Sequence, residues 1–183
     1  NCDITGWTSF ASTITKVTIK DSEFLNGNYN QLRFYQDAEI TNTTFNANMN
    51  IDNGQAGVTL EFEDCEVEGG ASLDSIIDEG TIFDSKVSID EQELNVAVIS
   101  NGVKTYFETL EEAVNAAQAG DEIKLANDVT TSGTVVLPNG ITFNGNGNVV
   151  NGTIQAGGAL TIAGETVVSG FSAGWYNNTI TIG

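Results

Sequence analysis

The sequence contains no histidine and only six lysines and arginines, against 25 aspartates and glutamates. Without histidine, the chain has no Ser-His-Asp or Cys-His catalytic system, no imidazole acid–base catalyst and no histidine ligand for zinc. Nucleic acid binding depends on basic side chains at the phosphates, and a net charge of −19 argues against it. Any chemistry must therefore use carboxylates, tyrosines, a few lysines or a bound ion.

Long apolar runs and proline are also scarce. The longest apolar runs have about four or five residues, so we expect no membrane insertion. The 20 glycines and single proline, with threonine and asparagine throughout, favour many short strands joined by tight turns. The 183 residues, 40% of them hydrophobic, can bury a core. The first four residues do not form a signal peptide, so we expect a mature or excised chain.

Four segments of the first half share one template. The first position is small or apolar, the third and eighth are apolar, the fifth is Asp or Asn, and the sixth is Ser, Thr or Cys. The starts lie 21, 22 and 20 residues apart, and each segment alternates as a half-buried strand does. One copy is too short to bury its own apolar face, so successive copies must stack. The segments are 17–24, 38–45, 60–67 and 80–87, and looser copies follow at 141–143, 160–167 and 180–182.

This template resembles the coils of the pectate-lyase-like superfamily, in which an Asn-type residue at a tight turn repeats as an internal ladder. The resemblance implies an all-β fold, a right-handed parallel β-helix of about seven coils of 19–22 residues. Enzymes, adhesins and phage fibres share this fold, so it implies no activity by itself. The ladder positions are Asn1, Asp21, Asn42, Asp64 and Asp84, and the residues after them, Cys2, Ser22, Thr43, Cys65 and Ser85, are expected to form a second stack.

Residues 109–119, between the two sets of coils, have the pattern of a short amphipathic α-helix. Thr109 and Glu112 match a capping box, and Gly120 is placed to end the helix. The stretch 103–125 resembles the start cap of β-helical domains in microbial surface proteins, where a helix plugs the open end of the coils. We therefore expect three parts: coils over 1–95, a strand and capping helix over 96–128, and coils over 129–183.

The two ends of the chain fit the template when they are read as one segment. Residues 180–183 followed by 1–4 satisfy every constrained position, and the count from Ile180 through the join to Val17 is 20 residues, one coil. A tandem array, a permuted domain, or a subunit completed by the N-terminus of the next molecule would each produce this match. The sequence leaves all three open, and the expected partner is another copy, bound through the terminal β-strands.

Two cysteines in an acidic extracellular protein would ordinarily form a disulfide. The template places Cys2 and Cys65 at the same position three coils apart, on the order of 14 Å from one another, whereas a disulfide needs Cα atoms within about 7 Å. We therefore predict that both thiols are free and buried.

Stacked coils place equivalent outward side chains about one strand spacing apart. Glu39 and Glu61 should then be neighbours, with Glu63 close by. Such carboxylates suit a glycosidase, a cation site or a solvated acidic surface, and we favour the surface because nothing else converges there. Five aromatic residues outside the core positions could stack on a sugar ring, if they do not simply close loops or cap coil ends: Trp7, Tyr29, Tyr35, Trp175 and Tyr176. Of these, Trp7, Trp175 and Tyr176 are the expected glycan contacts.

The lyases of the resembled superfamily use calcium-binding aspartates and a catalytic arginine. Arg33, the only arginine, is expected in a segment between strands, outside the template, and no aspartate cluster matches the family motifs. We therefore predict no catalytic residue, no metal ligand and no cofactor, with calcium left open. The leading hypothesis is a non-enzymatic extracellular or cell-surface protein, an adhesin-like or fibre-forming module that assembles head-to-tail or in tandem and contacts glycans or a host surface. The alternative is a polysaccharide lyase or glycoside hydrolase acting on an acidic glycan through Glu39, Glu61 and Glu63.

Overall fold

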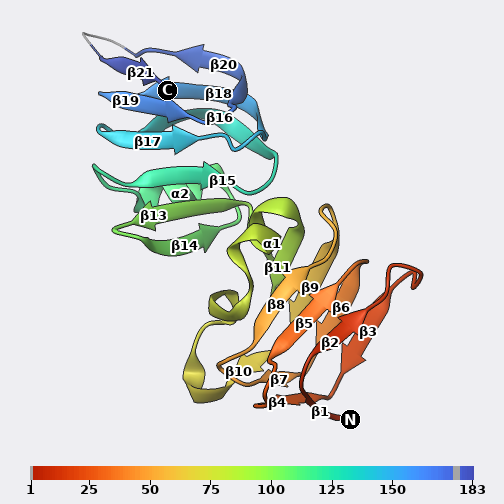
Figure 1. Cartoon of the computed structure of the whole chain (residues 1–183). Helices are drawn as coiled ribbons and strands as arrows, with labels where there is room; N and C mark the ends of the chain where they lie inside the picture. Colours follow the sequence, from red (N-terminus) through yellow and green to blue (C-terminus); the bar gives the residue numbers. More distant parts are fainter. Residues whose placement is uncertain (1, 175–177) are drawn as a thin grey trace. The chain divides into compact units, whose positions relative to one another are not determined.

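The structure is a computed structural model, and it describes residues 2–174 and 178–183. The chain divides into two compact units, Asn1–Glu93 (unit 1) and Leu94–Gly183 (unit 2) (Figure 1). Both units consist mainly of short parallel strands stacked as the coils of a parallel β-helix. Within the described residues, no helix is long and apolar enough to cross a membrane.

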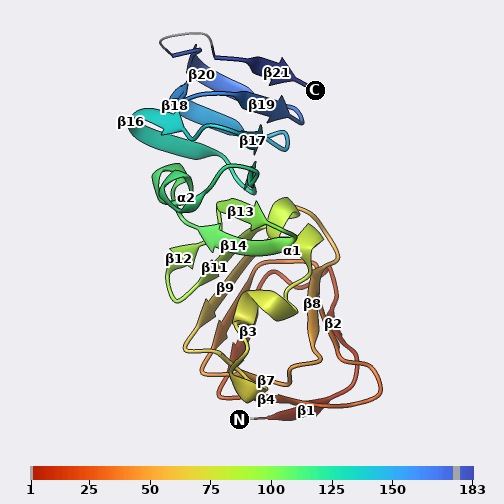
Figure 2. The same cartoon turned by 90° about the vertical axis from the view of Figure 1, so that its left-hand side faces the viewer.

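The first three coils of unit 1 each pass through three sheets, which form three sides of the coil in Figure 2. In the first sheet, β1 (Asp3–Thr5), β4 (Glu23–Leu25), β7 (Thr44–Phe45) and β10 (Glu66–Val67) lie in that order. The second has the order β2 (Thr8–Phe10), β5 (Gln31–Phe34) and β8 (Asn50–Asn53). The third runs β12 (Gln92–Glu93), β11 (Lys86–Ile89), β9 (Thr59–Glu63), β6 (Ala38–Thr41) and β3 (Val17–Lys20).

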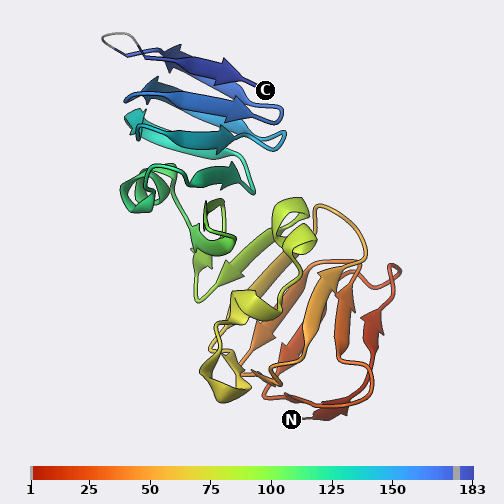
Figure 3. The same ribbon diagram turned by 60° about the vertical axis from the view of Figure 1, so that its left-hand side comes forward.

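Unit 2 stacks its coils in two sheets, visible as the green-to-blue strands of Figure 3. The larger sheet has the order β14 (Val103–Phe107), β13 (Val96–Ser100), β15 (Glu122–Leu125), β17 (Ile141–Asn144), β19 (Leu160–Ala163) and β21 (Ile180–Ile182). The smaller contains β16 (Val129–Leu137), β18 (Val149–Ala156) and β20 (Val167–Ser172). β13 is antiparallel to both of its neighbours, and the later coils are parallel.

The strand registers follow the repeat. Val17 lies opposite Ala38, and Ala38 lies opposite Leu60. Equivalent inward residues therefore stack into continuous rows, such as Phe24 and Phe45, whose ring centroids lie 5.1 Å apart. Because each coil covers the apolar face of the next, these side chains are almost fully buried.

The template turn has the same geometry in three successive coils. Asp21, Asn42 and Asp64 adopt left-handed φ angles of 49°, 47° and 51°. This conformation is strained for most residues but is tolerated by Asp and Asn. In the next position, the hydroxyls of Ser22 and Thr43 each donate a hydrogen bond to the carbonyl two residues earlier. Asn1, expected at the same turn, lies outside the described residues.

The fourth template copy, residues 80–87, does not form the predicted strand and ladder turn. Asp78 accepts a hydrogen bond from the N–H of Gly80 and caps a helix, α1 (Glu79–Asp84), which buries Ile82. Asp84 therefore ends a helix, and Ser85 follows it, so neither occupies the ladder turn. Two 3₁₀ turns, Glu68–Gly70 and Leu73–Ile76, precede α1. The strand resumes only at β11, where Val87 lies opposite Leu60.

Asp90 replaces Asp84 at the turn of the last coil of unit 1. Its φ angle is 49°, and its carboxylate accepts a hydrogen bond of 2.9 Å from the N–H of Asp64. The turn after β11 therefore keeps both the left-handed backbone and the link to the preceding coil. The chain then reverses into β12, which is antiparallel to β11.

The predicted helix is confirmed as α2 (Leu110–Ala116), shorter than the expected 109–119. Its capping box is present, since Glu112 N–H donates to Thr109 Oγ1 at 3.2 Å and Thr109 N–H donates to the Glu112 carboxylate at 3.1 Å. Leu110 and Ala113 are buried in the core that β13, β15 and β16 share. The helix thus covers apolar side chains at the start of the coils of unit 2.

The cysteine prediction is half confirmed. Cys2 and Cys65 are both free, but Cys2 is exposed and Cys65 is only partly buried. Cys2 immediately precedes β1, the edge strand of its sheet, so no described coil covers its outer side. The Sγ of Cys65 lies 3.4 Å from the carbonyl oxygen of Glu63, in the arrangement that Ser22 and Thr43 have in their own coils.

Candidate functional site

Trp7 and Gln31 occupy equivalent outward positions on two neighbouring coils. β2 pairs with β5 so that Thr8 lies opposite Leu32, which places Trp7 next to Gln31 in the row outside the sheet. Leu32 is fully buried, so the residue before it points outward by the alternation of a strand. Trp7 accordingly has 58% of its surface exposed.

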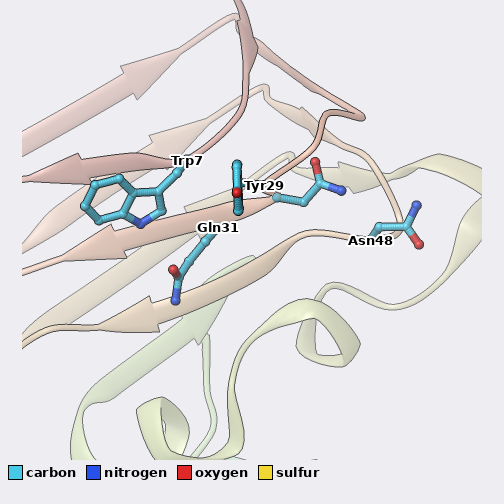
Figure 4. A pocket seen from close by; sticks show the side chains of 5 residues that line it. Trp7, Tyr29, Gln31 and Asn48 are labelled. Atoms are coloured by element: carbon cyan, nitrogen blue, oxygen red, sulfur yellow. The ribbon is translucent and has the colours of Figure 1, made fainter.

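An open pocket of about 520 Å³ lies along this outward row. Figure 4 shows its side chains arrayed from Trp7 at one end to Asn48 at the other, with Tyr29 and Gln31 between them. Tyr29 is 74% exposed, which is unusual in a unit whose phenylalanines are mostly buried. The lining residues are Trp7, Tyr29, Asn30, Gln31 and Asn48.

Two of the pocket's three amide side chains, those of Asn30 and Gln31, are held in place by hydrogen bonds. Asn30 Oδ1 accepts from the N–H of Gly27 at 2.8 Å, and Asn30 Nδ2 donates to Asn26 Oδ1 at 2.9 Å. These two bonds close the short loop that carries Tyr29. Gln31 Nε2 donates to Asp52 at 2.7 Å, which leaves the amide oxygen of Gln31 available as an acceptor.

Arg33 and Asp52 form an ion pair beside the pocket. Arg33 Nε lies 2.9 Å from Asp52 Oδ1, and Arg33 Nη2 lies 2.6 Å from Oδ2. The hydrogen bond to Asp52 raises the pKa of the Arg33 guanidinium. Arg33 lies within β5, not between strands as the sequence suggested, and it points outward with Asp52 directly opposite on β8. The pair neutralises itself, and no residue that lines the pocket carries a charge.

The acidic residues singled out in the sequence form a separate hollow of about 290 Å³. Glu39 lies directly opposite Glu61, as expected, and Glu63 lies two residues further along β9, opposite Thr41. Glu39 forms an ion pair with Lys16. The remaining lining residues are Ile40, Thr41, Ser88 and Glu91.

The carboxylates of this hollow differ in their pKa values. The hydrogen bond from Lys16 lowers the pKa of Glu39. Partial desolvation raises the pKa of Glu63, and the nearby charge of Glu91 adds to the effect. Within residues 2–174 and 178–183, no group of three or more Asp, Glu, Cys or His side chains is arranged to hold a metal ion. Lys16 pairs directly with Glu39, and the charge of Lys20 also lowers the Glu39 pKa.

Sequence reasoning found only part of the pocket. Trp7 was singled out, whereas Trp175 and Tyr176 lie outside the described residues. Asn30, Gln31 and Asn48 were missed, whereas Tyr29 was named, like Trp7, among the aromatic residues suited to stack on a sugar ring. Trp7, Gln31 and Asn50 lie one coil apart, and this spacing is the sequence pattern that indicates their alignment. It can be recognised only once the loop lengths between the strands are known.

No protein-family model matches this chain. Searches of curated proteins and of solved structures likewise found no match.

Proposed function

We propose that this chain is a structural β-helix module of the cell surface or extracellular space, whose copies join end to end into a rod. The C-terminal coil of one copy would stack on the N-terminal coil of the next, or of the next repeat in a tandem array. The acidic exterior, with a net charge of −19, would keep such a rod soluble.

The observation that carries this proposal is a pair of matching open edges. Among the described strands, β21 is the outermost member of its parallel sheet, and β3 is the outermost member of the sheet in unit 1 that repeats the same template. Ile180 lies opposite Leu160, and Val17 lies opposite Ala38, each at the first template position. A following copy would place its Val17 opposite Ile180, one 20-residue coil later.

The backbone groups at the two edges are complementary. Leu160 N–H donates to the carbonyl of Thr179, and Gly183 N–H donates to the carbonyl of Ile162, both at 3.0 Å. Residues 179, 181 and 183 therefore face β19, and Ile180 and Ile182 face the open edge, because backbone groups alternate sides along a parallel strand.

The same alternation applies to β3. Val17 N–H donates to the carbonyl of Asp37 at 2.9 Å, and Asp21 N–H donates to the carbonyl of Thr41 at 3.2 Å. Odd-numbered residues of β3 thus face β6, and Lys16, Thr18 and Lys20 face outward. In the joined strand pair, Ile180 N–H would donate to the Lys16 carbonyl, as Leu160 N–H donates to Thr179.

Apolar side chains at the C-terminal edge are incompletely covered. Ile182 is 80% exposed and Phe171, in β20, is 42% exposed. In interior coils, inward residues such as Phe45 and Phe143 are fully buried. Stacking one more coil would remove this apolar surface from water, and an unpaired parallel edge is itself a template for adding a strand.

Light scattering after gel filtration, with negative-stain electron microscopy, tests the proposal. The expected result is a mass that rises with concentration in multiples of 19.3 kDa, and rods in the images. Ile182→Pro removes an outward N–H without touching the bonds to β19, and should leave a monomer, whereas Ile182→Val should assemble like the natural chain. A natural chain that stays monomeric at every concentration refutes end-to-end joining.

A further inference from the structure

We propose that the pocket formed by Trp7, Tyr29, Asn30, Gln31 and Asn48 binds an uncharged sugar residue of a glycan. The inference rests on the chemistry of this pocket in unit 1 and does not depend on end-to-end joining. Four observations carry it: the exposed aromatic rings, the positioned amides, the size of the pocket and its lack of charge.

The two aromatic rings are the first observation. Trp7 and Tyr29 hold large apolar surfaces in water, while Phe24, Phe34 and Phe45 of the same unit are buried. Both side chains combine an apolar face with a polar group, an N–H or an O–H, that binds at its edge. A pyranose ring has the matching character, since its C–H groups form an apolar face and its hydroxyls lie around the rim.

The amide side chains supply the polar partners of such a rim. Three of the five lining residues are Asn or Gln, each with one acceptor oxygen and two N–H donors. Asn30 and Gln31 are already fixed by bonds to Asn26, Gly27 and Asp52, so little side-chain freedom is lost when a ligand binds. Asn48 is exposed at the far end of the pocket and adds a further donor and acceptor (Figure 4).

The volume and shape are those of a small-molecule site. The pocket, at about 520 Å³, lies within the range of roughly 300–1,000 Å³ that ligand pockets occupy. It is an open groove on the outer face of the coils, which suits one unit of a longer chain that continues past the pocket on either side. A closed cavity would not admit such a ligand.

The charge distribution favours a neutral sugar over an acidic one or a basic peptide. The only guanidinium nearby, that of Arg33, is engaged by Asp52, so no free cation faces the pocket to meet a uronate or sialate carboxylate. The net charge of −19 repels anions from the whole surface. A lysine or arginine side chain of a basic peptide ligand would lack a carboxylate partner in the pocket, because none of the lining residues is acidic.

Tryptophan fluorescence provides the test. The chain has two tryptophans, so Trp175→Phe leaves Trp7 as the only indole reporter. This variant is titrated with maltotriose, cellotriose, mannotriose and chitotriose. The expected result is a saturable change in Trp7 emission with at least one of these sugars.

Further variants separate the pocket from general surface effects. In the same background, Tyr29→Ala should weaken that binding about tenfold or more, because an aromatic anchor at the centre of a site carries much of its affinity. Tyr106→Ala, a tyrosine of unit 2, is the matched control and should change nothing. Calorimetry on Trp7→Ala in the natural background should show the same loss without relying on fluorescence.

Three results overturn the proposal. The first is no saturation with any of the four sugars. The second is sugar binding that Tyr29→Ala and Trp7→Ala leave unchanged, which places the sugar elsewhere. The third is saturation only with an oligogalacturonate or a lysine-rich peptide, which assigns the pocket to a charged ligand. Circular dichroism of each variant checks that it has kept its fold.

Discussion

The side-chain amide of Asn42 donates a hydrogen bond of 2.6 Å to Oδ1 of Asp21, across two neighbouring coils. Both residues have left-handed backbones, and their own N–H groups donate onward to the carbonyls of Thr41 and Glu63 in the following coils. One turn therefore both leads the chain from one sheet into the next and ties each coil to the following one. This turn is the structural feature that repeats from coil to coil in unit 1.

Two substitutions at Asn42 should destabilise the fold to different extents. Asn42→Gly loses the side-chain bond but keeps a residue that adopts positive φ freely, whereas Asn42→Ala loses both. We expect both variants to lower the free energy of unfolding, with alanine worse than glycine by about 1 kcal/mol. Urea denaturation followed by circular dichroism measures the difference. Equal stabilities for the two variants would show that the left-handed backbone contributes nothing here.

Substitutions at Glu63 and Glu39 in the acidic hollow should change stability in opposite directions. The raised pKa of Glu63 means that its protonated form is favoured in the folded chain, so its contribution to stability is present at low pH and is lost as pH rises through that pKa. The lowered pKa of Glu39 means the reverse, with stability present at neutral pH and lost on acidification.

We therefore expect Glu63→Gln to raise the melting temperature at neutral pH and Glu39→Gln to lower it. Both effects should be small, because the two side chains are solvent-accessible, and both should vanish once the pH is low enough to protonate the carboxylates. Thermal melts across a pH series provide the measurement. A lower melting temperature for Glu63→Gln at neutral pH contradicts the account.

The two cysteines should react at different rates. Burial raises the pKa of the Cys65 thiol, and its Sγ also lies near two backbone carbonyls, so little reactive thiolate forms. Cys2 is exposed, and iodoacetamide should modify it first in mass-spectrometric time courses. If copies join end to end, Cys2 lies at the joint and should become protected as the protein concentration rises. Faster alkylation of Cys65 would show that its burial is wrong.

The sequence predicted the parallel coils because their defining positions are local and repeated. Val17, Ala38 and Leu60 begin template copies, and each ends in the same row of one sheet. Asp21, Asn42 and Asp64 could be placed at the turn because few side chains tolerate its backbone. The capping box of Thr109 and Glu112 likewise identifies a helix from four consecutive residues.

The strand predicted for the fourth copy was wrong because a short apolar segment fits either a strand or a helix. Residues 80–87 match the template, but Asp78 caps a helix there, and Thr81 is buried with its hydroxyl bonded to Asn53. The helix uses Ile82 to cover the core, which the strand pattern would also have done. Besides the Asp78 cap, the contact with Asn53 in a different coil distinguishes the two, and such a contact is not visible in a local pattern.

The pocket shows a second limit. Tyr29 and Asn48 lie in segments between strands, where no template applies, yet both line the pocket. Their side chains come together through the pairing of β2, β5 and β8, which a repeat of the third sheet alone does not specify. Outward residues between strands are therefore the hardest part of such a fold to predict.

The most direct test of end-to-end joining mixes two variants, each blocked at one end. Ile182→Pro blocks β21, and Thr18→Pro blocks β3, since each removes an N–H that faces the open edge and spares the bonds within the copy. Thermal melts first establish that both variants fold as the natural chain does.

Light scattering on the separate and mixed variants then decides the matter. We predict that each variant alone is a monomer, and that their equimolar mixture forms a dimer and nothing larger, because only one intact β21 and one intact β3 remain to pair. A mixture that stays monomeric, or variants that each assemble as the natural chain does, would contradict the pairing of β21 with β3.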